Sequence, residues 1–209
     1  MAKNRDERRF IRQLRARDEA AFTELVRLHQ DRVFSVVYRM LGDREEARDV
    51  AQEVFVTVFR RIDGLRGESG LSTWLYRVAV NHCKNRIRFL RRRGGGRTRP
   101  VDELTDADWA AATAVAGGPA ATGISSPDRP DELLIAHRLA ERLQARLDAL
   151  DPDLRALVVL RDIEGLSYAD IAEVTGQPLG TVKSRIHRGR MALRDPVPPR
   201  GDDGAGGAS

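Results

Sequence analysis

The residues whose types and spacing are best suited to binding chemistry lie in one short stretch, 167–190. Its second half gathers four cations and no acidic residue: Lys183, Arg185, Arg188 and Arg190. Arginine can form paired hydrogen bonds with the edge of a guanine, and lysine, serine and threonine reach phosphates or base edges. Such a cluster is therefore typical of a nucleic-acid-binding surface, and an ordinary solvated basic face is the alternative.

Two short helices must position these cations. Ser167 is a suitable N-cap for the first helix, with Asp170 placed to complete a capping box. Gly176 supplies a turn, and Pro178 suits the start of the second helix. The second helix has an inner stripe at spacings of four, three and four, in which the glycine allows close packing: Val182, Ile186, Gly189 and Leu193. The pattern predicts a helix-turn-helix that presents its second helix to the major groove of DNA.

The remaining faces of the second helix carry the side chains that we expect to contact DNA. They are Thr181, Lys183, Ser184, Arg185, His187, Arg188 and Arg190. Just ahead of the helix-turn-helix, Asp151 as N-cap and Pro152 at the first helical position predict the start of a short buried helix that ends at Gly165.

The composition is typical of a globular protein without disulfides or membrane helices. The 209 residues carry a formal net charge of +5, and the sequence pI is about 9.9. The single cysteine, Cys83, excludes an intramolecular disulfide and fits a reducing cytosol. No stretch approaches the ~20 apolar residues of a membrane helix, and the first ten residues lack the apolar run of a signal peptide. We therefore expect a cytoplasmic protein.

The apolar periodicity predicts an all-α protein of two small helical domains joined by a flexible linker. Apolar residues recur at helical spacings over 8–93, and Ser72 is the expected N-cap of the last helix there. Residues 94–130 are rich in glycine, proline and alanine, which favours a linker or mobile loop. The second domain is expected at 131–195, and the tail 196–209 is expected to be disordered.

The first domain has two charged features. Glu45, Asp49 and Glu53 are spaced by four, so their carboxylates line one helical face, with Gln52 beside it. Such a stripe suits a basic partner surface, and a solvated acidic face is the alternative. Residues 72–99 hold nine Lys or Arg and no Asp or Glu, so this segment can follow a phosphate backbone.

Three stretches together resemble a known family. "GLSYADIAEVTGQPLGTVKSRIHRGRMAL" is similar to the C-terminal DNA-binding domain of the extracytoplasmic-function (ECF) group of bacterial sigma factors, and "GTVKSRIHRGR" is especially close to their recognition-helix signature. "DREEARDVAQEVFVTVFRRI" and "STWLYRVAVNHCKNRIRF" resemble the N-terminal domain of that family in order and spacing. The resemblance covers about residues 10–93 and 131–194, and "WLYRVAVNHCKNRIR" is most similar to the sigma-E-like branch.

The resemblance implies a sigma factor that binds core RNA polymerase and directs promoter-specific transcription initiation. A region-4 helix-turn-helix domain would read the −35 element. A region-2 helical bundle would contact the β′ clamp helices and recognise the −10 element as it melts, and the β subunit would be a further polymerase contact. The resemblance also implies an anti-sigma factor as regulator, membrane-anchored in many cases. No cofactor is implied, because promoter opening is driven by binding energy rather than by ATP hydrolysis.

Residue by residue, the resemblance assigns core-polymerase binding to Glu45, Asp49, Gln52 and Glu53. It assigns capture of the melted −10 strand to seven residues of a loop and the helix after it: Ser69, Ser72, Trp74, Asn81, Lys84, Asn85 and Arg88. A core aromatic is the favoured alternative for Trp74, and many family members carry aspartate where Asn85 stands. For the linker, a path toward the polymerase active-site cleft and a plain tether both stay open.

Two other functions fit this sequence less well. An enzyme is disfavoured, because none of the four histidines has a metal-ligand partner at useful spacing and no phosphate loop or nucleophile elbow occurs. We therefore expect no catalytic and no metal-binding residue. A repressor or activator with the same helix-turn-helix would need a dimerisation or ligand-binding domain, and it would leave the acidic stripe and the basic run without a role.

Overall fold

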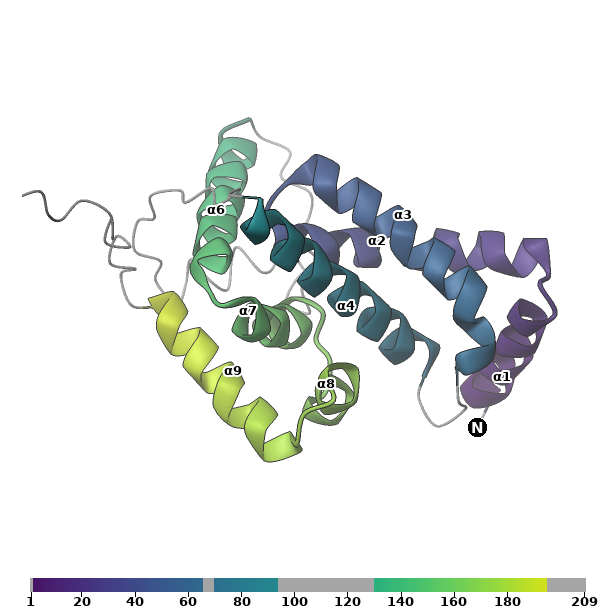
Figure 1. Ribbon diagram of the computed structural model, residues 1–209. Coiled ribbons are helices and arrows are strands. Elements are labelled where there is room, and N and C mark those ends of the chain that lie inside the picture. The colour runs from purple at the N-terminus through teal and green to yellow at the C-terminus, as the bar shows by residue number, and fades with distance from the viewer. Residues whose placement is uncertain (1, 66–69, 94–129, 195–209) are drawn as a thin grey trace, which may run out of the picture.

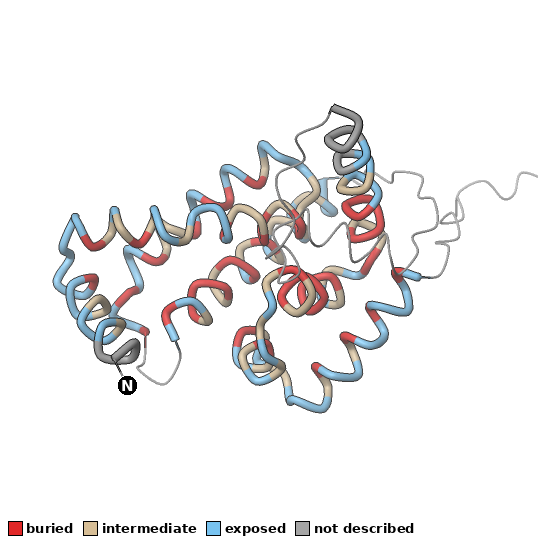
Figure 2. The backbone as a smooth tube through the Cα atoms, turned by 180° about the vertical axis from the view of Figure 1, so that it is seen from behind, coloured by how far each residue is buried: buried red, intermediate tan, exposed pale blue. Residues whose placement is uncertain are grey.

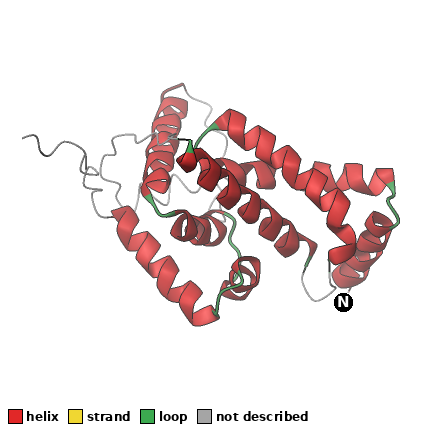
Figure 3. Cartoon of the chain, viewed as in Figure 1, coloured by secondary structure: helices red, strands yellow, loops and turns green. Residues whose placement is uncertain are grey.

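The computed structural model describes residues 2–65, 70–93 and 130–194. Every regular element within these residues is a helix, as Figure 3 shows, which confirms the all-α prediction. The predicted linker lies outside the described residues apart from Pro130, where a helix begins. The predicted disordered tail also lies outside them.

The N-terminal part contains four long helices and one 3-10 turn (Figure 1). They are α1 (Ala2–Arg15), α2 (Glu19–Leu41), α3 (Arg44–Arg61), the turn Ile62–Gly64 and α4 (Leu71–Arg92). Asp18 caps α2 by accepting from the backbone N–H of Ala21, and Asp43 caps α3 by accepting from two backbone N–H groups. The fully buried side chains of Val37, Val58 and Ala79 show that α2, α3 and α4 share one core.

The start of α4 differs from the prediction. The helix begins at Leu71 after an N-cap at Gly70, so the prediction that Ser72 is the N-cap is wrong. The backbone N–H of Leu71 instead donates to Oε1 of Glu7 in α1, at 2.8 Å. A carboxylate from a distant helix therefore satisfies a donor that a local cap would normally take, and its negative charge suits the helix N-terminus.

The C-terminal part contains shorter helices. They are α6 (Pro130–Ala149), α7 (Pro152–Val158), a π-helical turn at Val159–Ile163, α8 (Tyr168–Thr175) and α9 (Leu179–Arg194). The predicted helix start is confirmed, because Pro152 is the first residue of α7 and the side chain of Asp151 accepts from the backbone N–H of Asp153 at 2.9 Å.

The two parts pack directly against each other, which the sequence did not predict. α8 lies beside the N-terminal half of α4, and α7 lies beside its middle (Figure 1). Buried residues run through both α4 and α7 (Figure 2), and the buried side chains of the two parts form one continuous hydrophobic cluster. The basic helix α4 therefore packs against the N-terminal bundle on one side and against the C-terminal helices on another, and part of its surface stays exposed.

Candidate nucleic-acid interface

The helix-turn-helix is built as its sequence pattern indicates. The Oγ of Ser167 accepts from the backbone N–H of Asp170 at 3.1 Å, and the Asp170 carboxylate accepts from the backbone N–H of Ser167 at 3.3 Å. This reciprocal pair is the predicted capping box. Gly176 ends α8 in the left-handed region, with φ +67°, which glycine adopts without a steric penalty. Pro178 directly precedes α9.

The inner stripe of α9 is buried, as predicted. Its members are Val182, Ile186, Gly189 and Leu193. A Cβ atom on Gly189 would lie 2.7 Å from Cγ2 of Val158 in α7, closer than side chains pack. Because α9 approaches α7 so closely at this position, the opposite face of α9 is held at a fixed orientation toward solvent.

The outer face of α9 presents most of the predicted −35 contacts. Exposed members are Lys183, Ser184, His187, Arg188 and Arg190, and half-buried members are Thr181 and Arg185. Two of the arginines are held by neighbours: Nη1 of Arg185 donates to Oε1 of Gln177 at 3.1 Å, and Nε of Arg190 donates to Oδ2 of Asp162 at 3.0 Å. Among the described residues, none bonds to the guanidinium of Arg188, which stays available for a ligand.

The predicted −10 residues divide between exposed and covered positions on α4. Ser72, Asn81, Asn85 and Arg88 are exposed, and Nη1 of Arg88 donates to Oδ1 of Asn85 at 3.1 Å. Ser69 lies outside the described residues. Trp74 is 8% exposed and belongs to the hydrophobic core, which confirms the alternative that this residue is a core aromatic.

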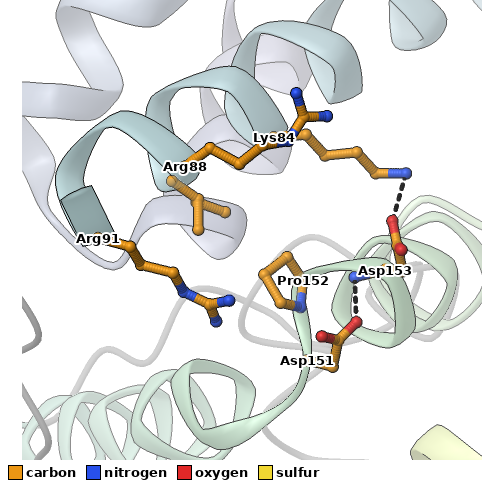
Figure 4. Close-up of a pocket in the computed structure, with 7 residues that line it drawn as sticks. Lys84, Arg88, Arg91, Asp151, Pro152 and Asp153 are labelled. Atoms are coloured by element: carbon orange, nitrogen blue, oxygen red, sulfur yellow. Dashed lines mark hydrogen bonds and ion pairs between the residues drawn. The ribbon is translucent and has the colours of Figure 1, made fainter.

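Lys84 is the covered member of this set. Its side chain is only 18% exposed, and its Nζ lies 2.6 Å from Oδ1 of Asp153 in α7. Figure 4 shows this ion pair at the edge of a cavity of about 170 Å³ between α4 and the start of α7. Arg88 and Arg91 line the same cavity from α4, and Asp151 lines it from the loop ahead of α7. Nothing in the sequence around Asp151 and Asp153 predicted that these residues lie beside the cations of α4.

A second cavity, of about 210 Å³, lies on the other side of the same acidic residues. Asp151, Asp153 and Leu154 line it together with Arg185 and Arg188 of α9. The hydrogen bond from Lys84 lowers the pKa of Asp153, and the positive charges of Lys84, Arg185 and Arg88 add to that effect against the opposing cost of burial. The start of α7 thus lies between the cations of α4 and those of α9.

The acidic stripe of α3 is solvent-exposed, as a docking surface requires. Glu45, Asp49, Gln52 and Glu53 are all exposed. Oε2 of Glu53 lies 3.3 Å from Nδ1 of His82 on α4. Two large apolar side chains of α3 are also half-exposed, Val56 at 48% and Phe59 at 47%. They lie one and two turns beyond the carboxylates, so the exposed face of α3 combines negative charge with apolar surface.

The described residues contain neither a metal-binding cluster nor a candidate membrane span. No group of three or more His, Cys, Asp or Glu side chains among them is arranged to hold a metal ion. None of the described helices is both long enough and apolar enough to span a membrane.

Comparison with known proteins connects both parts of this surface to one family. The family model described as Sigma-70 region 2 matches residues 25–93, and the model described as Sigma-70, region 4 matches residues 140–193. The RNA polymerase sigma-H factor of Pseudomonas aeruginosa is 37% identical over 164 residues, or 78% of this chain and 79% of that protein. The ECF RNA polymerase sigma-E factor of Escherichia coli K12 is 38% identical over 151 residues, or 72% of this chain and 73% of that protein.

A solved structure shows the same fold. The sigma factor RpoE in complex with the anti-sigma factor NepR from Bartonella quintana matches with a TM-score of 0.57 and 21% identity, over 82% of this chain and 93% of that chain. Both family models match in the expected order, and the two relatives are covered along more than two thirds of their length. This chain therefore belongs to the ECF group of RNA polymerase sigma factors, the non-catalytic initiation factors that give RNA polymerase its promoter specificity.

Proposed function

We propose that this chain binds core RNA polymerase through the exposed face of α3, reads the −35 element with α9 and reads the melted −10 element with α4. The main support is the orientation of α9, which buries one stripe against the domain and turns its cations outward. The buried stripe consists of Val182, Ile186, Gly189 and Leu193. A rigidly anchored helix with a basic outer face is the geometry that enters a major groove.

In the −35 interface, Arg188 is the principal base-reading residue. Its guanidinium is exposed on the middle of α9, where it can form two hydrogen bonds with a guanine. Arg185 and Arg190 are held by Gln177 and Asp162, which fixes their guanidinium groups on opposite flanks of the buried stripe. The remaining contacts are to phosphates or to the edges of neighbouring bases, from Thr181, Lys183, Ser184 and His187.

In the −10 interface, Asn81, Asn85 and Arg88 meet the melted strand from the exposed face of α4. Lys84 joins them once its ion pair with Asp153 opens. The loop that holds Ser69 and the first turn of α4 with Ser72 take the unstacked base. Trp74 supports this surface from the core and does not stack on a base, because its ring is buried.

The polymerase contact combines charge with apolar burial. Glu45, Asp49, Gln52 and Glu53 face the basic side of the β′ clamp helices. Val56 and Phe59 extend the same face of α3 with apolar surface that is half-exposed in this chain. Exposed ion pairs contribute only about 0–1 kcal/mol each. Burial of Val56 and Phe59 against the polymerase therefore supplies much of the affinity.

The domain limits proposed with this function are 8–93 for region 2, 94–130 for the linker and 131–195 for region 4. The β subunit is a further proposed polymerase contact. An anti-sigma factor is the proposed regulator, in keeping with the complex of RpoE with NepR. The role requires no catalysis by this chain and no cofactor, and it places the protein in the cytoplasm with the polymerase and the chromosome.

The experiment that separates this function from that of a repressor is DNA binding with and without core RNA polymerase. A sigma factor binds promoter DNA poorly alone and specifically in the holoenzyme. A repressor binds its operator specifically without polymerase, and that result would contradict the proposal. A fluorescently labelled promoter fragment and a scrambled fragment of equal length supply the matched pair.

A further inference from the structure

His82 of α4 joins two side chains of the neighbouring helix α3. Its Nδ1 lies 3.3 Å from Oε2 of Glu53, and its Nε2 lies 2.9 Å from Oγ1 of Thr57. Glu53 and Thr57 are four residues apart on α3, so their side chains lie on the same face of that helix. The imidazole thus bridges α4 and α3, and it uses both ring nitrogens to do so.

The proton positions in this chain of contacts follow from the chemistry of the partners. An ionised carboxylate only accepts hydrogen bonds, so Nδ1 of His82 carries the proton that it donates to Glu53. In the neutral ring Nε2 then has a free lone pair, and the Thr57 hydroxyl donates to it. Because the bond at one ring nitrogen sets the proton on the other, Thr57 selects the tautomer of His82 that can donate to Glu53.

The bridge restrains Glu53 and leaves it accessible. The side chain of His82 is 27% exposed, whereas that of Glu53 is 57% exposed. Among the described residues, none bonds to Oε1 of Glu53, so this oxygen is available to a cationic partner. A glutamate that is already held in the unbound chain loses less side-chain entropy when a partner binds it. His82 therefore prepares Glu53 for an ion pair with a second molecule.

Arg86 links the same two helices one turn further along α4. Its Nε pairs with Oε2 of Glu46, and both side chains are half-buried. The hydrogen bond with Glu46 raises the pKa of Arg86, and the negative charges of Glu53 and Asp49 add to that effect against the opposing cost of burial. Arg86 thus lies close to the acidic stripe, and its link to α3 holds α4 in the register that keeps His82 opposite Glu53.

We propose that His82 is a positioning residue of the polymerase contact, which holds Glu53 in the conformation that a basic surface of core RNA polymerase binds. This inference rests on the proposed assignment of the acidic stripe to the β′ clamp helices. Thr57 acts one step further from the partner, through the tautomer of His82. The polymerase-binding face of α3 therefore depends on a side chain of α4 that does not touch the polymerase.

The alternative is that His82 acts only through its charge. A protonated imidazole beside Glu53 would reduce the negative charge of the stripe, so its removal would strengthen the binding of a cationic partner. Removal of a positioning residue weakens the same binding, because Glu53 then has to be ordered by the partner. The two roles thus predict changes of opposite sign.

The first test measures the affinity of the full chain for core RNA polymerase. His82→Asn places an amide nitrogen close to the position of Nδ1, so it can still donate to Glu53, whereas His82→Gln carries its amide one bond further out, toward Thr57. We expect His82→Ala and His82→Gln to lower the affinity about two- to fivefold, and His82→Asn to stay within about twofold of the wild type. Equal losses in the two amide variants, or tighter binding by His82→Ala, would overturn the positioning role.

A double-mutant cycle connects this loss to Glu53. If His82 acts through that carboxylate, the loss caused by His82→Ala should disappear in a Glu53→Ala background. The full loss in that background would show that His82 acts elsewhere, and would overturn the inference. Circular dichroism and a melting curve establish that each variant is folded.

A spectroscopic signature tests the chain of hydrogen bonds without polymerase. The ¹⁵N chemical shifts of the His82 ring at pH 8 distinguish a proton on Nδ1 from a proton on Nε2. We expect the Nδ1–H tautomer in the wild type and in Thr57→Ser, which keeps the hydroxyl, and a smaller Nδ1–H fraction in Thr57→Val, which lacks it. A wild-type ring with its proton on Nε2 would overturn the proposed geometry.

The outcomes separate this inference from the proposed function. If Asp49→Arg with Glu53→Arg abolishes core binding and His82→Ala leaves it unchanged, the stripe keeps its role and the positioning role is removed. If the doubly reversed stripe binds core polymerase at the wild-type level, the proposed contact fails, and the positioning role fails with it.

Discussion

Gly189 of α9 packs against Val158 of α7 so closely that a Cβ on the glycine would lie 2.7 Å from Cγ2 of the valine. Valine has little freedom to move, because its branched side chain is fixed at χ1. We expect Gly189→Ala to destabilise the protein by about 1–2 kcal/mol, since overpacking outweighs the gain in helix propensity. Urea unfolding measures the loss.

Two variants control this prediction. Gly180→Ala lies in the same helix with nothing within 4 Å of the new Cβ, so it should leave stability unchanged or raise it. Gly189→Ala should lower the free energy of unfolding less in a Val158→Ala background than in the wild type, because the shortened side chain leaves room for the new Cβ. A Gly189→Ala protein as stable as Gly180→Ala would show that α9 has room at this position.

Arg188 and Arg190 should give distinguishable losses of −35 binding. Arg188→Ala removes a base contact, so the holoenzyme should lose about 1–3 kcal/mol on the cognate promoter and much less on a promoter changed at the contacted base pair. Arg190→Ala removes the hydrogen bond to Asp162 that holds the helix, so it should weaken binding to both promoters alike. Asp162→Asn should resemble Arg190→Ala. Equal behaviour of the two arginine variants would contradict this division.

The exposed stripe of α3 should be required for polymerase and not for DNA. Asp49→Arg combined with Glu53→Arg should abolish binding to core polymerase in a pull-down or fluorescence assay. The same variant should keep its melting temperature, because both side chains are exposed. Reversal of the charge at Glu19, which is exposed in the first turn of α2, is the matched control. Core binding by the double variant at the wild-type level would exclude the stripe as the contact.

The buried carboxyl of Glu164 should make stability depend on pH. Burial raises its pKa, against the opposing hydrogen bond from Tyr76. The folded protein therefore binds this proton more tightly than the unfolded chain, so the contribution is fully present below the unfolded pKa of about 4.5 and is lost as the pH rises through the folded value. Glu164→Gln should remove that loss.

The measurement is the free energy of unfolding of both proteins at pH 4 and pH 7. Glu164→Gln should gain stability relative to the wild type on going from pH 4 to pH 7. Tyr76→Phe takes away the hydroxyl that donates to Glu164. Its stability relative to the wild type should therefore fall on going from pH 4 to pH 7. A difference between Glu164→Gln and the wild type that does not change with pH would contradict the buried-carboxyl account.

Local chemistry made the helix-turn-helix predictable. The capping box of Ser167 and Asp170, the turn at Gly176 and the inner stripe of α9 depend on residues within about four positions of one another. The same reasoning failed at Ser72, because the donor at the start of α4 is satisfied by Glu7, 64 residues away. Patterns within one helix carry no information about such a partner.

The surfaces of α3 and α4 were only partly predictable for a similar reason. The acidic stripe follows from a spacing of four, whereas the exposure of Phe59 depends on how α2 and α3 pack. The ion pair of Lys84 with Asp153 joins residues that are far apart in the chain, and each one alone looks like a solvated surface charge. The docking of the two domains is therefore visible in the structure and absent from the sequence pattern.

Run-off transcription tests the central claim most directly. The purified chain is mixed with bacterial core RNA polymerase and sheared DNA from its own genome, and the transcript starts are mapped. The sigma-factor account predicts discrete starts that share sequence motifs near −35 and −10, that disappear without the protein and that weaken with Arg188→Ala. Tight and specific DNA binding by the chain alone, with no such starts, would contradict the account and identify a conventional DNA-binding regulator.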